Sequence, residues 1–415
     1  MSSDLQSLTY HPTIPVSPAE VYRAFTNSTA LREWFCDTAT VSARPNGHLF
    51  VGWHNGYYAT GHFTELQENR LVAFSWQGRG EPAPTQVRVE LAPDDEGARL
   101  TLEHSGIGRG VEWGETAARF DRAWRRSLEN LSSVLTTGED LRVTRRPMLG
   151  ILLANFSADD ATRLGIPVSQ GVRLNGVVPQ LGADAAGLRQ DDVIVAIDGL
   201  PVADVIALRT ALSSHLAGDV VDVEFYRGPV RHDTPMVLSG RKIPPIPATP
   251  AELSEQVRRR YLRDEAALTE FLSGITDMEA SYQPGPDEWS VKQVLAHLIQ
   301  GERYNHQWIG ELIGGHEGAY DDYSGNQALR LSATIHAFPT VADMAAELAR
   351  LNAETLALMD SLPDEFVQRK RTYWRLARTF LDESYSHIAD HLGQMRAAVV
   401  AARAAGIGGT SAEGA

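Results

Sequence analysis

The chain of 415 residues contains a single cysteine, Cys36. One cysteine excludes an internal disulfide framework and any metal site that is built from several thiolates. The sequence also lacks a run of about 18 apolar residues, the length that an α-helix needs to cross a bilayer. Its first residues, MSSDLQSLTYHPTIPV, contain neither the basic segment nor the apolar core of a secretory signal. We therefore expect a protein of a reducing compartment, the cytoplasm.

Basic residues are scarce relative to acidic ones. The chain has 38 Lys and Arg against 53 Asp and Glu, which gives a formal net charge of −15. Such an excess of acid predicts that neither nucleic acid nor a membrane surface is a partner. Apolar residues make up 43% of the chain, which excludes disorder and collagen-like repeats. At roughly 100–200 residues per domain, the length predicts two to four domains.

The character of the sequence changes near residues 140 and 246. Five of the eight tryptophans precede the first change, none lies between the two, and three follow the second. The second change falls in the segment IPPIPATP (243–250), whose prolines predict a stiff, extended spacer. We predict three domains, residues 1–137, 138–245 and 246–405, and a disordered tail of residues 406–415. Most of the net negative charge lies in the third domain.

Residues 1–137 read as strands enclosed by helices. Short helices are expected at 18–25, after Ser17 as N-cap, and at 29–35. Five strands are expected at 47–54, 57–66, 71–76, 86–91 and 99–104, with a tight turn at the Asn-Gly of 55–56. A long helix with a continuous apolar stripe begins near Trp113.

This order of elements and several short strings resemble the helix-grip, or START-like (SRPBCC), superfamily. The strings are PAEVYRAF (18–25), LREWF (31–35), GHFTEL (61–66) and RLVAFSW (70–76). More narrowly, they resemble the branch that is named after activators of the heat-shock ATPase. The resemblance implies an apolar cavity between sheet and helix that holds a small ligand. Its candidate lining is aromatic: Trp53, Trp76, Trp113, Phe120 and Trp124. The alternative is that these rings only fill the core, as buried aromatic side chains commonly do.

Residues 138–245 read as short strands around one amphipathic helix. The helix is expected at 204–215, and the turns include Asp198-Gly199. The string ADAAGLRQDDVI (183–194) followed by IDG (197–199) resembles a PDZ domain of the kind attached to HtrA-type proteases. No Gly-x-Ser-x-Gly with a suitable His and Asp context accompanies it, so we expect no protease domain.

The PDZ resemblance implies that a peptide C-terminus is bound. In that family a loop receives the terminal carboxylate and the peptide adds as a strand to the sheet edge. Carried over to this sequence, the loop is Pro147, Met148, Leu149 and Gly150, the strand contributes Ile151 and Leu153, and the pocket is lined by Leu208 and Leu212. A module that acts only as a spacer, with an occluded groove, is the alternative.

Residues 246–405 read as four long helices with polar loops, which predicts a four-helix bundle. The helices are expected at 250–273, 290–313, 340–361 and 376–405, with capping boxes that begin at Ser290 and Thr340. His387 and His391 are four residues apart on the last helix, so their side chains project from one face. That spacing allows one helix to supply two ligands to one metal ion. A third histidine, His297, lies among apolar residues of the second helix.

Two strings of this region, DEWSVKQVLAHL (287–298) and HIADH (387–391), resemble the DinB-like superfamily of helical bundles. The resemblance implies a divalent metal that is held by His297, His387 and His391, with one open position. Three imidazoles suit zinc, nickel or iron. Within the superfamily some members are thiol-dependent transferases or isomerases, and many others have no assigned activity. Glu302 and Asp390 are candidates for proton acceptors or for outer partners of the metal ligands. The alternative is that both are solvated carboxylates on the exposed face of a helix.

Together these patterns predict a multidomain α+β protein. It combines a helix-grip α+β domain, a β-rich PDZ-like domain and an all-α four-helix bundle. The favoured function is a cytoplasmic sensor or adaptor that binds a small apolar ligand, a peptide and a divalent metal. A metal-dependent enzyme, such as a transferase of small thiols, is the alternative.

Overall fold

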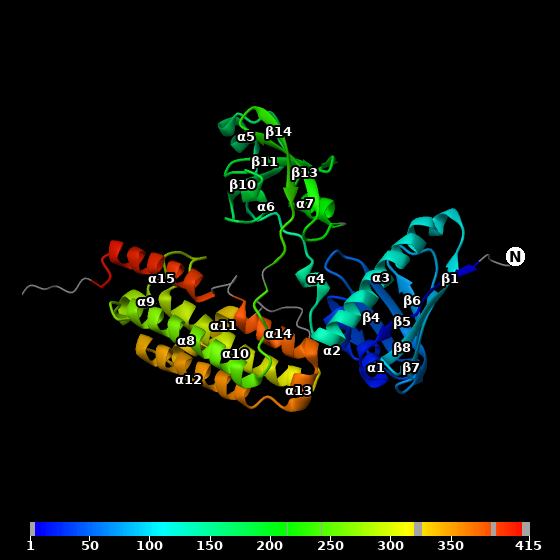
Figure 1. Ribbon diagram of the computed structural model, residues 1–415. Helices are drawn as coiled ribbons and strands as arrows, with labels where there is room; N and C mark the ends of the chain where they lie inside the picture. Colours follow the sequence, from blue (N-terminus) through cyan, green and yellow to red (C-terminus); the bar gives the residue numbers. More distant parts are fainter. Residues whose placement is uncertain (1–4, 214, 242, 319–325, 383–386, 409–415) are drawn as a thin grey trace, which may run out of the picture. The chain divides into compact units, whose positions relative to one another are not determined.

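The structure of the chain is a computed structural model that describes residues 5–213, 215–241, 243–318, 326–382 and 387–408, with the side chains of residues 387 and 389 left out. The chain divides into two compact units (Figure 1). The first combines Met1–Gly138 with Pro244–Ala415, and the second is Glu139–Ile243. Helices and antiparallel sheets together make a multidomain α+β protein, as the sequence predicts. No helix of the described ranges is long and apolar enough to cross a membrane.

The N-terminal part of the first unit is an antiparallel sheet with three α-helices. Its strands are β1 (Leu5–Tyr10), β2 (Thr13–Ile14), β3 (Thr38–Val41), β4 (His48–Gly52), β5 (Tyr58–Gln67), β6 (Leu71–Gly78), β7 (Thr85–Asp94) and β8 (Gly97–Gly108). Its helices are α1 (Pro18–Thr26), α2 (Ser28–Trp34) and α3 (Gly114–Thr137), preceded by the 3₁₀ turn η1 (Val111–Trp113). The strand order is β1-β8-β7-β6-β5-β4-β3, with β2 paired to β8. The five strands that alternation predicts are all present.

The long helix α3 packs its apolar stripe against the inner face of this sheet. Phe120, Trp124 and Leu131 are buried with inward residues of the strands in one core cluster. The helix ends at Gly138, which has the left-handed φ of 82° that glycine adopts without strain. A Cβ at this position would also collide with the carbonyl of Lys370, so glycine meets two requirements there. Ser17 caps α1 in a capping box with Glu20, as the sequence predicts.

A buried histidine, His104 on β8, is held in one tautomer by its neighbours. The Trp124 indole N–H, which can only donate, lies 3.0 Å from His104 Nδ1, so Nδ1 accepts. Nε2 therefore carries the proton and donates to Thr85 Oγ1 at 2.8 Å. Burial lowers the pKa of His104 from 6.5 to about 3, because a charged ring would be desolvated there.

This shift predicts a specific loss of stability in acid. Between pH 6.5 and about 3 the unfolded chain binds a proton at His104 that the folded chain does not. Stability from this group is therefore complete above pH 6.5 and falls as the pH drops. From pH 7 to pH 5 the expected loss is about 2 kcal/mol. The free energy of unfolding in urea is measured at pH 7 and pH 5 for the wild type and for His104→Gln. The decrease between the two pH values should be about 2 kcal/mol smaller for His104→Gln, because the other twelve histidines are common to both proteins. Equal differences in the two proteins would contradict this assignment.

The second unit is an antiparallel sheet of short strands with small helices. Its strands are β9 (Ile151–Ala154), β10 (Val172–Val177), β11 (Val193–Ile197), β12 (Leu200–Pro201), β13 (Val220–Arg227) and β14 (Val230–Val237), and its helices are α4 (Leu141–Thr144), α5 (Ala158–Leu164), α6 (Gly182–Ala185) and α7 (Val205–Leu212). The strand order β14-β13-β11-β10-β9 leaves β9 at one edge. The sequence predicts β10, β11, β13 and α7 closely, but it misses α5 and starts β14 at Pro235, five residues late.

The C-terminal part of the first unit is helical. Its helices are α8 (Pro250–Leu272), α9 (Asp277–Ser281), α10 (Val291–Gly314), α11 (Gln327–Ala337), α12 (Val341–Asp360), α13 (Asp364–Gln368), α14 (Lys370–Leu381) and α15 (His387–Ala404). The predicted caps Ser290 and Thr340 both form capping boxes. The helix α12 packs along both α10 and α8.

One expectation for this region is wrong. The sequence predicts a single last helix over 376–405, whereas α14 ends at Leu381 and α15 begins at His387. The backbone of Asp382 is extended, with ψ of 102°, so the helix cannot continue through it. The Arg260 guanidinium stabilises this end, because its Nη1 donates to the carbonyls of Phe380 at 2.8 Å and Asp382 at 3.5 Å. The helix α11, inside a predicted loop, was also not expected.

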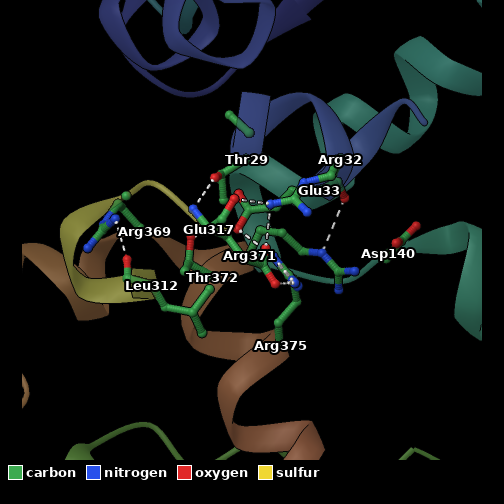
Figure 2. A network of polar contacts seen from close by, with 12 residues as sticks. Thr29, Arg32, Glu33, Asp140, Leu312, Glu317, Arg369, Arg371, Thr372 and Arg375 are labelled. Atoms are coloured by element: carbon green, nitrogen blue, oxygen red, sulfur yellow. Dashed lines mark hydrogen bonds and ion pairs between the residues drawn. The ribbon is translucent and has the colours of Figure 1, made fainter. Parts of the chain in front are cut away.

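A buried polar network joins the two parts of the first unit (Figure 2). The Glu317 carboxylate lies between Arg375 Nη2, at 2.9 and 3.0 Å, and Arg32 Nη2, at 3.0 Å. Trp308 Nε1 donates to the same carboxylate at 2.8 Å, and the Glu317 N–H donates to Thr29 Oγ1 at 2.9 Å. Four hydrogen bonds from three side chains, Arg375, Arg32 and Trp308, compensate for the removal of this carboxylate from water.

A second carboxylate extends the network toward the start of α14. Glu33 accepts a hydrogen bond from Thr372 Oγ1 at 2.8 Å and lies 3.5 Å from Arg375 Nη1. Arg371 Nε donates to the Glu33 carbonyl at 3.2 Å (Figure 2). Glu33, Arg371 and Thr372 are all buried. The helix α2 therefore contacts α14 through buried hydrogen bonds and an ion pair.

Candidate functional site

Two of the three predicted metal ligands lie together in the helical part. The rings of His297, on α10, and His391, on α15, have centroids 5.1 Å apart and planes inclined by 70°. His387 is the first residue of α15, one turn before His391, and its side chain lies outside the described residues. The Trp289 ring packs against His297 with a centroid distance of 5.2 Å. The structure therefore places two of the three predicted ligands, His297 and His391, side by side.

The separation of these rings fits two imidazoles on one metal ion. Ring nitrogens that bind zinc at about 2.0–2.1 Å, in tetrahedral geometry, bring the two ring centroids to about 5 Å. His391 Nδ1 lies 3.0 Å from Gln394 Oε1, one turn further along α15. A hydrogen bond from Nδ1–H to this oxygen orients the ring and puts the lone pair on Nε2, as outer partners of metal ligands do.

A complete ligand set is not found among the described side chains. No group of three or more His, Cys, Asp or Glu suited to a metal ion occurs within them. The third predicted ligand, His387, is not part of that search because its side chain is not described. The metal site with His297, His387 and His391 thus stays a prediction.

A cavity of about 500 Å³ adjoins His297; we call it the helical cavity. Helices α8, α10, α12 and α14 line it, together with the first turn of α15. Its wall contains apolar side chains and a group of polar ones, which are Arg260, Tyr261, Asp264, Glu265, His297, Glu302, Tyr304, Asn305, Asn352 and Thr379. A ligand in this cavity would therefore contact both His297 and several carboxylates.

Glu302 holds a fixed position in the wall of the helical cavity. Its Oε2 accepts hydrogen bonds from the Tyr261 hydroxyl at 3.0 Å and from Thr355 Oγ1 at 2.9 Å. Burial and the neighbouring Glu302 carboxylate raise the pKa of Tyr261 well above its ordinary value, so this hydroxyl keeps its proton. A second carboxylate of the wall, Glu265, accepts from Asn352 Nδ2 at 2.9 Å.

Sequence reasoning identified Glu302 as a candidate but missed its partners. His306 lies one turn after Glu302 on α10, a spacing that could have suggested a shared face. Tyr261 and Thr355 come from α8 and α12, and no sequence signal connects them with α10. The other candidate, Asp390, is exposed on α15.

In the second unit the predicted peptide-binding residues lie around β9 and α7. The chain from Pro147 to Gly150 leads into β9, which contains Ile151 and Leu153. The carbonyls of Leu149 and Gly150 accept hydrogen bonds from the N–H groups of Ala183 and Val178, both at 2.8 Å. Leu149 and the α7 residue Leu208 are buried in one core cluster, against which Ile151 and Leu212 pack. The residues of the loop, of the edge strand and of the helix thus share one core cluster or pack against it.

The aromatic residues of the predicted ligand cavity contact one another in the N-terminal core. Trp76, Trp113, Phe120 and Trp124 are buried, and Trp53 packs against them. The Trp76 ring centroid lies 6.5 Å from that of Trp53 and 6.4 Å from that of Trp124. Phe35, which the sequence did not single out, stacks on Trp124 at 5.3 Å. Such ring-to-ring contacts are typical of core packing, which is the alternative interpretation that the sequence left open for these residues.

Comparison with protein families identifies three regions of the chain. Residues 15–136 match the family described as Activator of Hsp90 ATPase homolog 1-like protein. Residues 147–235 match the PDZ domain family, and residues 260–396 match the DinB superfamily. The three resemblances drawn from the sequence are thereby confirmed.

Each curated relative matches a stretch of this chain that is about as long as the PDZ region. A probable periplasmic serine protease, do/HhoA-like, from Haemophilus influenzae is 30% identical over 94 residues, which are 23% of this chain and 20% of that protein. The serine protease Do-like HtrA of Lactococcus lactis is 38% identical over 87 residues, 20% of this chain and 21% of that protein. The chain thus spans about a fifth of the length of these relatives.

Solved structures resemble the chain over about a third of its length. The Aha1 dimer from Colwellia psychrerythraea is 19% identical and covers 31% of this chain and 96% of its own, with a TM-score of 0.28. An HSP90 activator from Plasmodium falciparum is 23% identical and covers 32% of this chain and 96% of its own, with a TM-score of 0.27.

Proposed function

We propose that this protein is a sensor or adaptor whose helical part binds a divalent metal and whose PDZ domain binds a peptide C-terminus. The observation that carries the proposal is the pairing of His297 with His391, at a ring separation suited to one metal ion. His387, one turn before His391 on α15, would be the third ligand. Bound there, a divalent cation would attract an anionic or polarisable ligand atom.

The residues around this pair support the proposal. Gln394 orients His391, and Trp289 covers one side of His297. The DinB-type match spans all three histidines. Zinc, nickel and iron each accept three imidazoles, and metal analysis of the purified protein distinguishes among them.

A metal-dependent enzyme is the second candidate function, and one observation favours it. The helical cavity adjoins His297 and contains Glu302, a carboxylate that could accept a proton from a bound ligand. Incubating the metal-loaded protein with glutathione and 1-chloro-2,4-dinitrobenzene separates the two candidates. Metal-dependent conjugation would favour the enzyme, and bound metal without turnover would favour the adaptor.

For the PDZ domain we propose that the peptide adds to the edge strand β9 and places its last side chain between Ile151 and the helix α7. A pocket that contains Leu208 and Leu212 would prefer an apolar C-terminal residue. The terminal carboxylate would lie at the loop from Pro147 to Gly150.

Replacing Leu212 by alanine tests this proposal. The substitution removes part of an apolar pocket, so the dissociation constant of a fluorescent decapeptide ending in a free Val carboxylate should rise about 10-fold or more. Leu152→Ala is the matched control, because Leu152 points to the opposite face of β9 from Leu153. The same decapeptide with an amidated C-terminus should not bind. Equal affinities for wild type and Leu212→Ala would exclude this pocket.

For the N-terminal domain a small apolar ligand remains part of the proposal. Such a ligand would have to displace contacts among rings such as Trp53, Trp76 and Trp124. We also propose a cytoplasmic setting, on the ground of the single cysteine, Cys36, which is buried. Two relatives are described as periplasmic, so cell fractionation tests this part of the proposal directly.

A further inference from the structure

The wall of the helical cavity contains carboxylates that no basic side chain of the described residues balances. We propose that the cavity binds an organic amine, a ligand with an apolar body and a protonated ammonium group. Glu265, Glu302 and Asn352, all in the wall, would recognise the ammonium group. This inference goes beyond the proposed function, because it requires no metal ion at His297.

The charges of the described wall do not cancel. The wall contains the carboxylates of Asp264, Glu265 and Glu302 and the guanidinium group of Arg260. Arg260 Nε lies 3.9 Å from Asp264 Oδ2, so these two charges pair with each other. Within the described part of the chain, neither Glu265 nor Glu302 forms an ion pair with Lys, Arg or His. The cavity therefore has an excess of negative charge.

Uncharged side chains hold both of these carboxylates in place. The Tyr261 hydroxyl and Thr355 Oγ1 donate to Glu302 Oε2, at 3.0 and 2.9 Å. Asn352 Nδ2 donates to Glu265 Oε1 at 2.9 Å. No described residue donates a hydrogen bond to Glu302 Oε1 or to Glu265 Oε2. Each carboxylate is thus fixed through one oxygen and keeps the other for a ligand.

The amide oxygen of Asn352 is a third acceptor in this wall. The residue is only 7% exposed, although it lines the cavity. A carboxylate can only accept, so the amide nitrogen faces Glu265 and Oδ1 is the other end of the amide group. Among the described residues no donor reaches Oδ1. A buried amide oxygen without a protein donor requires one from the contents of the cavity.

The three acceptors belong to one group of contacts across α8, α10 and α12. On α8, Glu265 lies one turn after Tyr261, and on α12, Asn352 lies one turn before Thr355. Tyr261 and Thr355 both bond to Glu302, on α10. Asn352 closes the group through its bond to Glu265. A primary ammonium group has one positive charge and three N–H donors, so it complements three such oxygens.

The remainder of the wall favours an organic cation over a bare metal ion. A volume of about 500 Å³ is within the range of sites for small organic molecules. Hard cations such as Ca²⁺ and Mg²⁺ require six or more oxygen ligands. Much of this wall is instead apolar, and its described apolar residues are Leu268, Leu298, Leu348, Phe380 and Ile388. The apolar body of an amine would pack against these side chains.

The test compares amines with uncharged molecules of the same shape. Hexylamine and 2-phenylethylamine are titrated into the protein by calorimetry at pH 7.5, where both amines are protonated. Hexanol and 2-phenylethanol have the same apolar bodies without the charge. At least one amine should bind about 10-fold or more tightly than its alcohol. The proposal is overturned if neither amine binds more tightly than its alcohol.

Two substitutions assign the preference to the carboxylates. Glu265→Gln and Glu302→Gln keep the shape of the side chain and remove its charge, so each should weaken amine binding by about 10-fold or more. Glu270→Gln is the matched control, because Glu270 is also on α8 but is exposed and does not belong to the described wall. Its amine affinity should stay within about twofold of the wild type. Unchanged amine affinity in both cavity variants would contradict the proposal.

Repeating the titration after treatment with EDTA separates this inference from the metal site. The preference for amines should be at least as large without metal, because a divalent cation at His297 would repel an ammonium group. A preference that disappears with the metal would show that Glu265 and Glu302 do not recognise the amine by themselves, and would overturn the inference. A protein that binds no metal but prefers amines would remove the metal site and support the inference.

Discussion

Replacing Glu317 by alanine should destabilise the first unit by about 3–5 kcal/mol, the range expected when one partner of a buried ion pair is removed. Burial alone would raise the pKa of Glu317, but the hydrogen bond and charge of Arg375, with Trp308 and Arg32, outweigh it and hold the pKa below its ordinary value. Without this carboxylate, two guanidinium groups lose a buried partner. The side chain of Arg375 is largely buried, so water cannot replace the lost contacts.

The effect of Glu317→Ala is measured as the shift of the urea midpoint, followed by circular dichroism for the helices and by tryptophan fluorescence. In the wild type the two signals should change together, because Glu317 and Glu33 join α2 to α14. In the variant the transitions should separate. Glu90→Ala is the matched control, since Glu90 also pairs with an arginine, Arg88, but is exposed, and its removal should cost less than about 1 kcal/mol. If Glu317→Ala shifts the urea midpoint no more than Glu90→Ala does, the buried network contributes little to the stability of the first unit.

Replacing His297 by alanine should weaken zinc binding by at least about 100-fold. Loss of an outer partner of a metal ligand already costs 10–100-fold in affinity, and loss of a ligand itself costs more. The dissociation constant is measured by competition with a zinc chelator at pH 7. His336→Ala, on α11 and outside the predicted ligand set, should leave the affinity unchanged. Unaltered affinity in His297→Ala would remove α10 from the metal site.

Gln394→Ala provides a finer test of the same site. The Gln394 side chain orients His391, so its loss should reduce zinc affinity by about 10–100-fold without removing a ligand. An order of effects in which His297→Ala exceeds Gln394→Ala, and both exceed His336→Ala, distinguishes a built site from scattered surface histidines.

Most of the fold could be predicted where one local pattern decides it. Alternation in the strands β4–β8, the apolar stripe of α3 and the capping boxes at Ser290 and Thr340 are all short-range signals. The end of α14 was not predictable in this way. The last turn of this helix is contacted by Arg260, more than a hundred residues away, which donates to the carbonyl of Phe380. No window along the sequence contains both residues.

In the candidate site, too, some features follow from a local sequence pattern and others depend on tertiary packing. The spacing of His387 and His391 is local and could be read directly, whereas the approach of His391 to His297 depends on the packing of α15 against α10. Tyr261 and Thr355 reach Glu302 from two other helices. Hydrophobic periodicity also does not predict the contact between α2 and α14. In the sequence Glu33 and Arg375 are not distinguishable from the exposed charged residues of amphipathic helices.

The central claim is that His297, His387 and His391 hold one divalent metal, and the most direct measurement is the metal content of the purified protein beside that of His387→Ala. Elemental analysis of the wild type should find about one equivalent of zinc, nickel or iron per chain, and the variant should retain less than about a tenth of it. His387→Ala tests the one ligand whose side chain the structure does not describe. A wild-type protein without metal after reconstitution, or a variant with the same content as the wild type, would contradict the claim.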